Sequence, residues 1–353
     1  MRPIRDILIE QCTAAGKDAY VDSLRQINQD TSGYVGTISA LRLFPIKALG
    51  ELLVDEVRVT EFGLQSADGY PDRGLMLGIQ NDDPAKGSGA QYTRFSQRKL
   101  AELNLVKAKL EAGLLKYTAT GMPDITLSPG DMIPRKGATV TVEAVPGTVV
   151  KAVVENGRIT ESIRAFIGRF RKDAGKVDVL FPAKNDKRTV EERHRRSQQA
   201  KTFFSDGGQI LLASASSLAF VQRHINRKPG TPRQIPMSVF RPNIEVSDWP
   251  ENLEDILTDA VIEGMMDECV EDVLQLFGDL SVRCSVTMVD PVTGKRARDG
   301  EPLATFGTVR PLRADGSSKK PTFAVNTVFP QQMQGRIIRL NDTIVSGREK
   351  QIY

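Results

Sequence analysis

From residue 34 onward, the chain is divided into short runs of β-branched and other apolar residues, and each run ends near glycine, proline or aspartate. Thr37–Leu43 and Leu52–Val59 are two of these runs. Their length suits strands better than helices, and the residues between them favour tight turns. A long series of short strands is typical of a β-barrel, so this pattern predicts a strand-rich fold.

Length and charge limit the class of protein further. With 353 residues the chain exceeds the roughly 100–200 residues of one domain, so we expect one large domain or two interlocked domains. Hydrophobic residues make up 40% and charged residues 26%, which is near the globular average and excludes a disordered or collagen-like chain. The net charge of +4 suits anionic ligands but is too small for a protein that coats nucleic acid, so no nucleic-acid partner is expected.

Cysteine and histidine are scarce, which excludes a four-cysteine iron–sulfur cluster or a zinc ribbon: the chain has only Cys12, Cys269, Cys284, His194 and His224. We expect Cys12 and Cys269 to be packing residues. His224 should pack at a helix edge, and His194 should be solvated. An odd number of cysteines without a CxxC motif fits a reducing compartment. Because the chain also lacks an apolar stretch of about 18 residues and a signal peptide, we expect a cytoplasmic protein without a membrane partner.

An amphipathic helix is predicted ahead of the strands, within an extension that covers residues 1–36. Its apolar side chains recur at helical spacing over residues 3–29 and include Ile4, Leu8, Cys12, Ala15 and Ala19. A helix of this kind gains most of its stability when such a stripe is buried. The stripe can dock on the barrel of its own chain or on a second copy, in which case the protein is a homo-oligomer.

Three further segments have helical spacing of apolar residues, and we expect helices at 96–112, 160–172 and 251–277. The segment 184–201 mixes both signs of charge and has no apolar stripe, so we expect it to be solvated.

The strongest local signal for chemistry is the segment Ser281–Gly294. Its β-branched residues predict a strand, and its Asp-Pro-x-Thr-Gly ending predicts a turn. Cys284 lies early in this strand, directly after Arg283. A neighbouring guanidinium favours the thiolate, which is the form that binds a soft metal or attacks an electrophile. The alternative is a buried structural cysteine, which is the commoner role of a free cysteine.

Five motifs follow one another along the chain: Phe44-Pro45-Ile46-Lys47, Asp72-Arg73-Gly74, Phe204-Ser205-Asp206, Phe240-Arg241-Pro242-Asn243 and Arg283-Cys284. Together, from about residue 37 to residue 346, they resemble the MOSC family, named after the C-terminal domain of molybdenum cofactor sulfurase. The branch that they resemble contains the mitochondrial amidoxime-reducing component and its bacterial relatives.

This resemblance implies an α+β, strand-rich fold with a MOSC-type β-barrel, an N-terminal MOSC barrel-like subdomain and flanking helices. We expect the added helical extension at 1–36, the N-terminal subdomain at 37–180 and the C-terminal MOSC domain at 181–353. Within the second segment, residues 37–73 are expected to join the C-terminal barrel.

The resemblance also implies a molybdenum–pyranopterin cofactor. By position, Cys284 would be the catalytic residue and the metal ligand. The residues expected to bind the cofactor are Lys47, Arg73, Asp206, Gly207, Gly208, Arg241, Asn243 and Arg283. Guanidinium groups match phosphate as bidentate donors, and glycine lets backbone N–H groups approach an anion closely. Arg98, in Ser96-Gln97-Arg98, stands where members have T-x-R.

Three residues depart from the family pattern. Ala48 replaces a serine after Lys47, Val282 replaces a serine before Arg283, and Asn326 stands where members have an aromatic residue. The first two changes would each remove a hydrogen bond to the cofactor.

The function implied is a molybdenum-dependent oxidoreductase that reduces small N-hydroxylated compounds. Its electrons would come from a separate donor protein, either ferredoxin-like or cytochrome-like. Two alternatives stay open at this point. One is a binding or scaffold protein with the MOSC fold and no cofactor chemistry, and the other is a sulfur carrier that uses Cys284.

Overall fold

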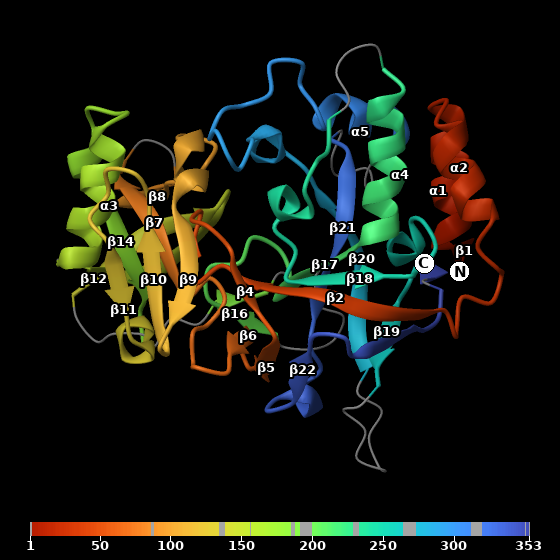
Figure 1. The fold of residues 1–353 in the computed structure, drawn as a ribbon, viewed down its shortest axis with the longest axis horizontal. Helices are drawn as coiled ribbons and strands as arrows, with labels where there is room; N and C mark the ends of the chain where they lie inside the picture. Colours follow the sequence, from red (N-terminus) through yellow and green to blue (C-terminus); the bar gives the residue numbers. More distant parts are fainter. Residues whose placement is uncertain are drawn as a thin grey trace.

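The computed structural model describes residues 2–349 and 351–352, apart from 86–87, 134–137, 156, 185–187, 191–199, 229–232, 264–272 and 312–319. Within this part the fold is α+β and rich in strands, as the sequence predicts. Two closed β-barrels lie beside each other along the long axis of the molecule (Figure 1).

The smaller barrel closes because β14 pairs with β13 on one side and with β7 on the other. Its strands are β7 (Leu75–Gln80), β8 (Tyr92–Arg94), β12 (Thr139–Val145), β13 (Thr148–Glu155) and β14 (Val177–Pro182). Helix α3 (Arg158–Gly168) packs on its outer side with Ile163, Phe166 and Ile167 buried, and this confirms the helix predicted at 160–172.

The larger barrel closes because β2 (Val35–Leu43) pairs with both β18 and β23. The ring continues through β18 (Ile244–Ser247), β17 (Ile210–Ser214), β21 (Thr322–Val328), β20 (Val273–Val282), β19 (Asp259–Ile262) and β23 (Thr343–Ser346). Strand β4 (Leu52–Val54) pairs with β2 outside the ring. Helices α4 (Ala215–Asn226) and α5 (Leu303–Val309) pack on each other beside this barrel.

Shorter sheets complete the structure. They comprise β9 (Lys107–Glu111), β10 (Leu114–Thr118) and β11 (Ile125–Leu127), and β5 (Glu56–Thr60), β6 (Gly63–Ser66) and β22 (Ile337–Arg339). Two-residue strands pair as β1 (Arg2–Pro3) with β24 (Gln351–Ile352) and as β15 (Arg188–Thr189) with β16 (Lys201–Thr202). Strand β3 (Ile46–Lys47) joins the sheet of the smaller barrel through β7.

One hydrophobic cluster contains side chains from both barrels, while Met76, Val142, Ala152 and Leu180 of the smaller barrel belong to a separate cluster. Leu77 and Val179 from the smaller barrel and Leu212 and Val325 from the larger barrel belong to a single cluster of buried side chains. Close packing of this kind leaves little freedom for one barrel to move against the other.

Two of the predicted helices are wrong. Within 96–112, residues Lys107–Glu111 form β9, which turns back into β10 at Ala112 and Gly113, with φ of 48° and 73°. Positive φ at both turn residues is the geometry of a tight hairpin. Within 251–277, the described residues form a short 3-10 turn, then β19 and β20. A short apolar run suits a buried strand as well as a helix, and pairing with neighbouring strands decided between them.

The strand predicted in the β-branched part of Ser281–Gly294 is wrong beyond Val282, whereas the turn predicted at its Asp-Pro-x-Thr-Gly ending is present. Strand β20 ends at Val282, and Ser285–Met288 form a 3-10 turn in which the Thr287 hydroxyl donates to Cys284 O at 2.9 Å. Of the scarce residues, Cys12 is buried and His224 packs against the Phe220 ring in α4, as predicted. His194 and Cys269 lie outside the described residues, as does most of the segment 184–201. Arg188, within that segment, is buried rather than solvated.

The N-terminal extension contains two helices instead of one, because Gly16, with φ of 66°, ends α1 (Ile4–Ala14) before α2 (Asp18–Arg25) begins. Ile4, Leu8 and Cys12 of the predicted stripe are buried within the same chain, together with Tyr20 and Leu24 of α2, whereas Ala15 is exposed and Ala19 is half-buried. The buried part of the stripe is therefore already covered by its own chain.

A buried polar network holds α2 on the larger barrel. The Arg310 side chain is 0% exposed and pairs with the Asp255 carboxylate at 2.8 Å. It also donates to Asn252 Oδ1, and to Thr322 O at 3.1 Å. From α2, the Tyr20 hydroxyl donates to Asp255 Oδ2 at 2.8 Å. Arg310 is thus the cation that compensates the buried Asp255 carboxylate, to which the Tyr20 hydroxyl of α2 also bonds.

Replacement of Arg310 by methionine is expected to destabilise the protein by about 3–5 kcal/mol, because it leaves the Asp255 carboxylate buried without its cation. Urea denaturation followed by circular dichroism measures this loss. The control is Arg25→Met on the exposed face of α2, which should change the free energy of unfolding by no more than about 0.5 kcal/mol. Equal stability of the two variants would contradict the role given to Arg310.

Candidate functional site

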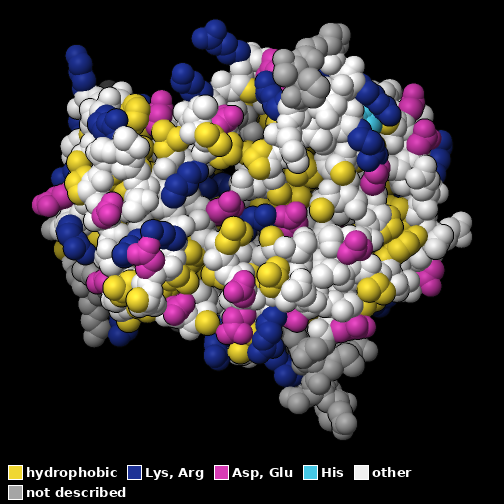
Figure 2. All heavy atoms as spheres, in the orientation of Figure 1, with side chains coloured by type: hydrophobic (Ala, Val, Ile, Leu, Met, Phe, Trp, Pro, Cys, Tyr) yellow, Lys and Arg dark blue, Asp and Glu magenta, His cyan; other side chains and the backbone are white. Residues whose placement is uncertain are grey.

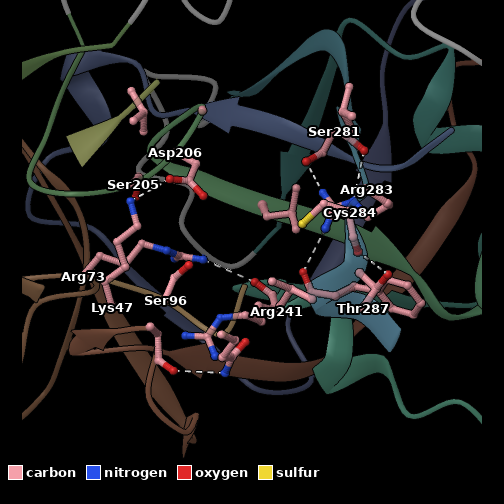
Figure 3. A pocket seen from close by; sticks show the side chains of 18 of the residues that line it. Lys47, Arg73, Ser96, Ser205, Asp206, Arg241, Ser281, Arg283, Cys284 and Thr287 are labelled. Carbon is pink, nitrogen blue, oxygen red and sulfur yellow. Dashed lines mark hydrogen bonds and ion pairs between the residues drawn. The ribbon is translucent and has the colours of Figure 1, made fainter. Parts of the chain in front are cut away.

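A cavity of about 380 Å³ lies between the two barrels, and both contribute to its wall. Of the residues predicted to bind a cofactor, all but one line it: Lys47, Arg73, Asp206, Gly207, Gly208, Arg241, Arg283 and Cys284. The labelled side chains from distant parts of the chain converge on this space in Figure 3. In the space-filling view, a hollow separates the two barrels, and Lys and Arg side chains lie along its border (Figure 2).

Lys47 lies on β3, so pairing of β3 with β7 fixes its position in the cavity wall. Its side chain is 9% exposed, and its ammonium donates to Asp206 Oδ1 at 2.6 Å and to Phe204 O at 2.5 Å. Burial lowers the pKa of Lys47 to about 7, although the Asp206 carboxylate opposes this shift. The cavity wall therefore contains an amine that gains or loses its proton near neutral pH.

Arg73 and Arg241 both have left-handed backbone conformations, with φ of 49° and 59°. Side chains rarely tolerate this region, and such strain is common at binding sites. The Arg241 guanidinium stacks 4.0 Å from the Phe44 ring centre and donates to Leu49 O at 2.8 Å. Burial and the neighbouring Arg73 together lower the pKa of Arg241 to about 10. Two guanidinium groups of like charge are thus crowded at one end of the cavity.

Asn243 is the predicted site residue that does not line the cavity. It is fully buried behind Arg73, and its Oδ1 accepts from the Arg73 guanidinium and from Leu211 N, both at 3.1 Å. Its amide nitrogen donates to Arg42 O at 3.0 Å. Asn243 is therefore placed to orient Arg73.

Cys284 lies in the cavity wall at the point where β20 has ended. Its sulfur accepts a hydrogen bond from Arg98 Nε at 3.3 Å. The adjacent Arg283 makes no hydrogen bond to the sulfur and donates instead to Phe240 O at 3.1 Å and to Ser281 O at 3.0 Å. The cation in contact with the sulfur is thus Arg98, 186 residues away in sequence, rather than the neighbour that the sequence suggested.

The Gly207-Gly208 loop passes close to β21. A Cβ atom at Gly207 would lie 2.6 Å from Asn326 Oδ1, and one at Gly208 would lie 2.5 Å from Thr327 O. At Gly208 the close neighbour is backbone, so close approach rather than a positive φ requires glycine there, whereas at Gly207 the neighbour is the end of the Asn326 side chain. Asn326, which stands where family members have an aromatic residue, occupies the space beside this loop.

Two arginines in the cavity wall, Arg94 and Arg98, make contacts with predicted site residues that the sequence did not indicate. Arg94, at the end of β8, was not predicted, and it pairs with the Asp206 carboxylate. Arg98 was recognised only from the T-x-R position, and its bond to Cys284 comes from the fold. The alternation of side chains along β8 could have indicated that Arg94 shares a face with Tyr92.

The charge and donor set of the cavity fit an anionic cofactor with a soft metal. Six lining residues are cationic and one is acidic: Lys47, Arg73, Arg94, Arg98, Arg241 and Arg283 against Asp206. Cys284 supplies one thiolate, a ligand that suits a soft metal. The described residues contain no group of three or more His, Cys, Asp or Glu side chains that could hold a metal ion. A metal bound here would therefore need most of its ligands from the cofactor itself.

Comparison with known proteins gives a family match for part of the chain. Residues 35–156 match the family model of the MOSC N-terminal beta barrel domain. The chain is similar to human mitochondrial amidoxime-reducing component 1, with 26% identity over 295 residues that cover 81% of this chain and 75% of that protein. It is 28% identical to rat mitochondrial amidoxime reducing component 2 over 304 residues, which cover 84% of this chain and 78% of that protein. The MOSC resemblance predicted from the sequence is confirmed.

The described helices include none that is long and apolar enough to cross a membrane. The cytoplasmic location stays a prediction.

Anion binding at Lys47 is expected to depend on pH. Because the pKa of Lys47 is lowered to about 7, the amine is largely neutral at pH 8, and an anion must be accompanied by a proton. Sulfate affinity of the cofactor-free protein should therefore fall by up to about tenfold per pH unit above pH 7. Calorimetry in two buffers of different ionisation enthalpy measures both the affinity and the proton uptake. Sulfate is suitable because its own charge is constant in this range.

Lys47→Gln is the control for this measurement, since it removes the titrating amine and should remove the proton uptake. Equal sulfate affinity at pH 6 and pH 8.5 in the unaltered protein would refute the expectation.

Proposed function

We propose that this chain, whose residues 35–156 match the MOSC N-terminal beta barrel domain, binds a molybdenum–pyranopterin cofactor between its two barrels and reduces small N-hydroxylated compounds. The observation that carries the proposal is the composition of one cavity wall, in which Cys284 and the cations Lys47, Arg73 and Arg241 line the same space. A thiolate at one place and crowded cations at another suit a ligand that has a metal and a phosphate group.

In this proposal the cavity wall holds the cofactor at its phosphate and at its metal. Lys47, Arg73 and Arg241 neutralise the phosphate of the cofactor, with the backbone of Gly207 and Gly208 beside it. Cys284 is the protein ligand to the metal. When bound, the cofactor supplies a metal that can accept the oxygen atom of an N–O bond.

The chain's own contribution to the chemistry is to hold the thiolate and to accommodate charge. Arg98 donates to the Cys284 sulfur at 3.3 Å, so it stabilises negative charge on that atom and orients it. Lys47 and Arg94 hold the Asp206 carboxylate, which is 61% exposed. Thus the one acidic group in the cavity wall is paired and adds little repulsion toward an anionic cofactor.

The overall reaction requires electrons from outside the substrate. Conversion of R–NHOH to R–NH₂ breaks the N–O bond, releases water and consumes two protons and two electrons. The chain has three cysteines in all, too few for a four-cysteine iron–sulfur cluster, so a separate protein is the electron donor in this proposal.

Replacement of Cys284 by alanine is expected to abolish molybdenum-dependent reduction of a hydroxylamine or amidoxime. The loss of a small side chain typically costs only about 1 kcal/mol, so the variant should still fold. Metal analysis, pterin fluorescence after oxidative release, and turnover with reduced methyl viologen measure the three properties separately. A variant with full metal content and full turnover would exclude Cys284 as the ligand.

The same measurements on the unaltered protein distinguish the proposal from its alternatives. A scaffold protein would contain neither metal nor pterin. A sulfur carrier would show a persulfide on Cys284 in place of a metal.

A further inference from the structure

We propose that an exposed basic surface beside the cavity docks an acidic electron-donor protein. The surface, named the basic rim, consists of Lys99, Arg171, Lys295 and Arg296. The inference rests on the proposed reductase function, because a reductase of this type must receive electrons at the cavity in every cycle.

The basic rim is connected directly to the segment that contacts Cys284. Arg296 donates to Arg98 O at 2.6 Å and to Gln97 O at 2.9 Å. Arg171 donates to Lys99 O at 3.3 Å. Arg98, in the middle of this segment, donates to the Cys284 sulfur. A protein docked on the basic rim would therefore lie beside the residue that we propose as the metal ligand.

Like charges are crowded along this surface. Lys99, Lys295 and Arg296 are exposed. Partial burial lowers the pKa of Lys99, and the nearby Arg171 and Arg94 lower it further, which indicates that these cations are close enough to repel one another. Crowding of this kind is relieved when an anionic surface approaches.

The nearby acidic groups only partly offset this charge. Asp173 pairs with the Arg171 guanidinium at 2.6 Å. The Asp290 carboxylate accepts from the backbone N–H groups of Val292 and Thr293, both at 2.8 Å. Both acids therefore have local partners, while Lys99 and Lys295 have no ion pair among the described residues.

An exposed apolar residue accompanies the cations. Val292 is 82% exposed, on the loop that also contains Lys295 and that is held by a bond from Lys107 Nζ to Pro291 O at 2.8 Å. Next to Arg171, the Phe170 ring is 41% exposed. Exposed apolar side chains among charged ones are typical of protein interfaces.

The positive charge of the basic rim and the need for rapid association and dissociation indicate the kind of partner. A donor that delivers electrons one at a time must associate and dissociate quickly, and interfaces of this class are small and transient. Opposite charges raise the association rate without requiring a large contact area. An acidic surface on a small redox protein matches the basic rim on both counts.

The test compares two variants with the same change of charge. K99E/K295E reverses two rim side chains that make no described side-chain hydrogen bond, and it leaves Arg171 and Arg296 to support the cavity segment. The matched control is R25E/R227E, which reverses two exposed arginines on α2 and at the end of α4. Association of an acidic [2Fe–2S] ferredoxin with the cofactor-loaded full chain is measured by calorimetry at low and high salt. Reduction of a hydroxylamine is measured with reduced ferredoxin and with reduced methyl viologen.

The rim variant should lose at least about tenfold in ferredoxin affinity and in ferredoxin-supported rate at low salt, and the difference should shrink at high salt. Its viologen-supported rate should equal that of the unaltered protein, and R25E/R227E should keep both rates. Absence of ferredoxin binding to the unaltered protein, or equal weakening in both variants, would overturn the proposal. Failure of viologen-supported reduction in the unaltered protein would instead refute the proposed function, because ferredoxin binding is measured without turnover.

Discussion

Backbone pairing of one continuous segment, residues 35–47, joins the two barrels. Strand β2 closes the larger barrel by pairing with β18 on one edge and β23 on the other. Strand β2 ends at Leu43, and β3, which begins at Ile46, pairs with β7 of the smaller barrel. Since each pairing fixes the register of its strand and the face to which its side chains point, the placement of Lys47 follows from the pairing of this segment with both barrels.

The cavity concentrates features that cost folding free energy. Arg73 and Arg241 have left-handed backbones, and Lys47 is an amine with little exposure to solvent. Strained conformations and buried charges persist only where the surrounding structure enforces them. Here the continuous core and the buried Asn243 amide, which bonds Arg73, Leu211 and Arg42, supply that support. A ligand that neutralises the cations would stabilise the folded protein by mass action.

The larger barrel contains a second buried charge network, and its role differs from that of the cavity. Arg310 and Asp255 neutralise each other with no exposure to solvent, and Tyr20 of α2 completes the network. Because it is closed off by α2, this network secures the N-terminal helices to the barrel. The six cations that line the cavity, in contrast, outnumber Asp206 in its wall and the buried Asp72 that pairs with Arg73, so positive charge remains available for a ligand.

The amino-acid sequence by itself determined the strand-rich class and the helix at α3, which follow from local apolar spacing, and most of the charged residues that line the cavity, which follow from motifs that resemble the MOSC family. Tertiary structure decided that segments such as Lys107–Glu111 and Asp259–Ile262 became strands, because a partner strand supplies backbone hydrogen bonds that local propensity does not reveal. It also decided that Arg98, rather than Arg283, contacts the Cys284 sulfur. The direction of a side chain depends on where its strand or turn lies relative to distant segments, and adjacency in sequence does not specify that direction.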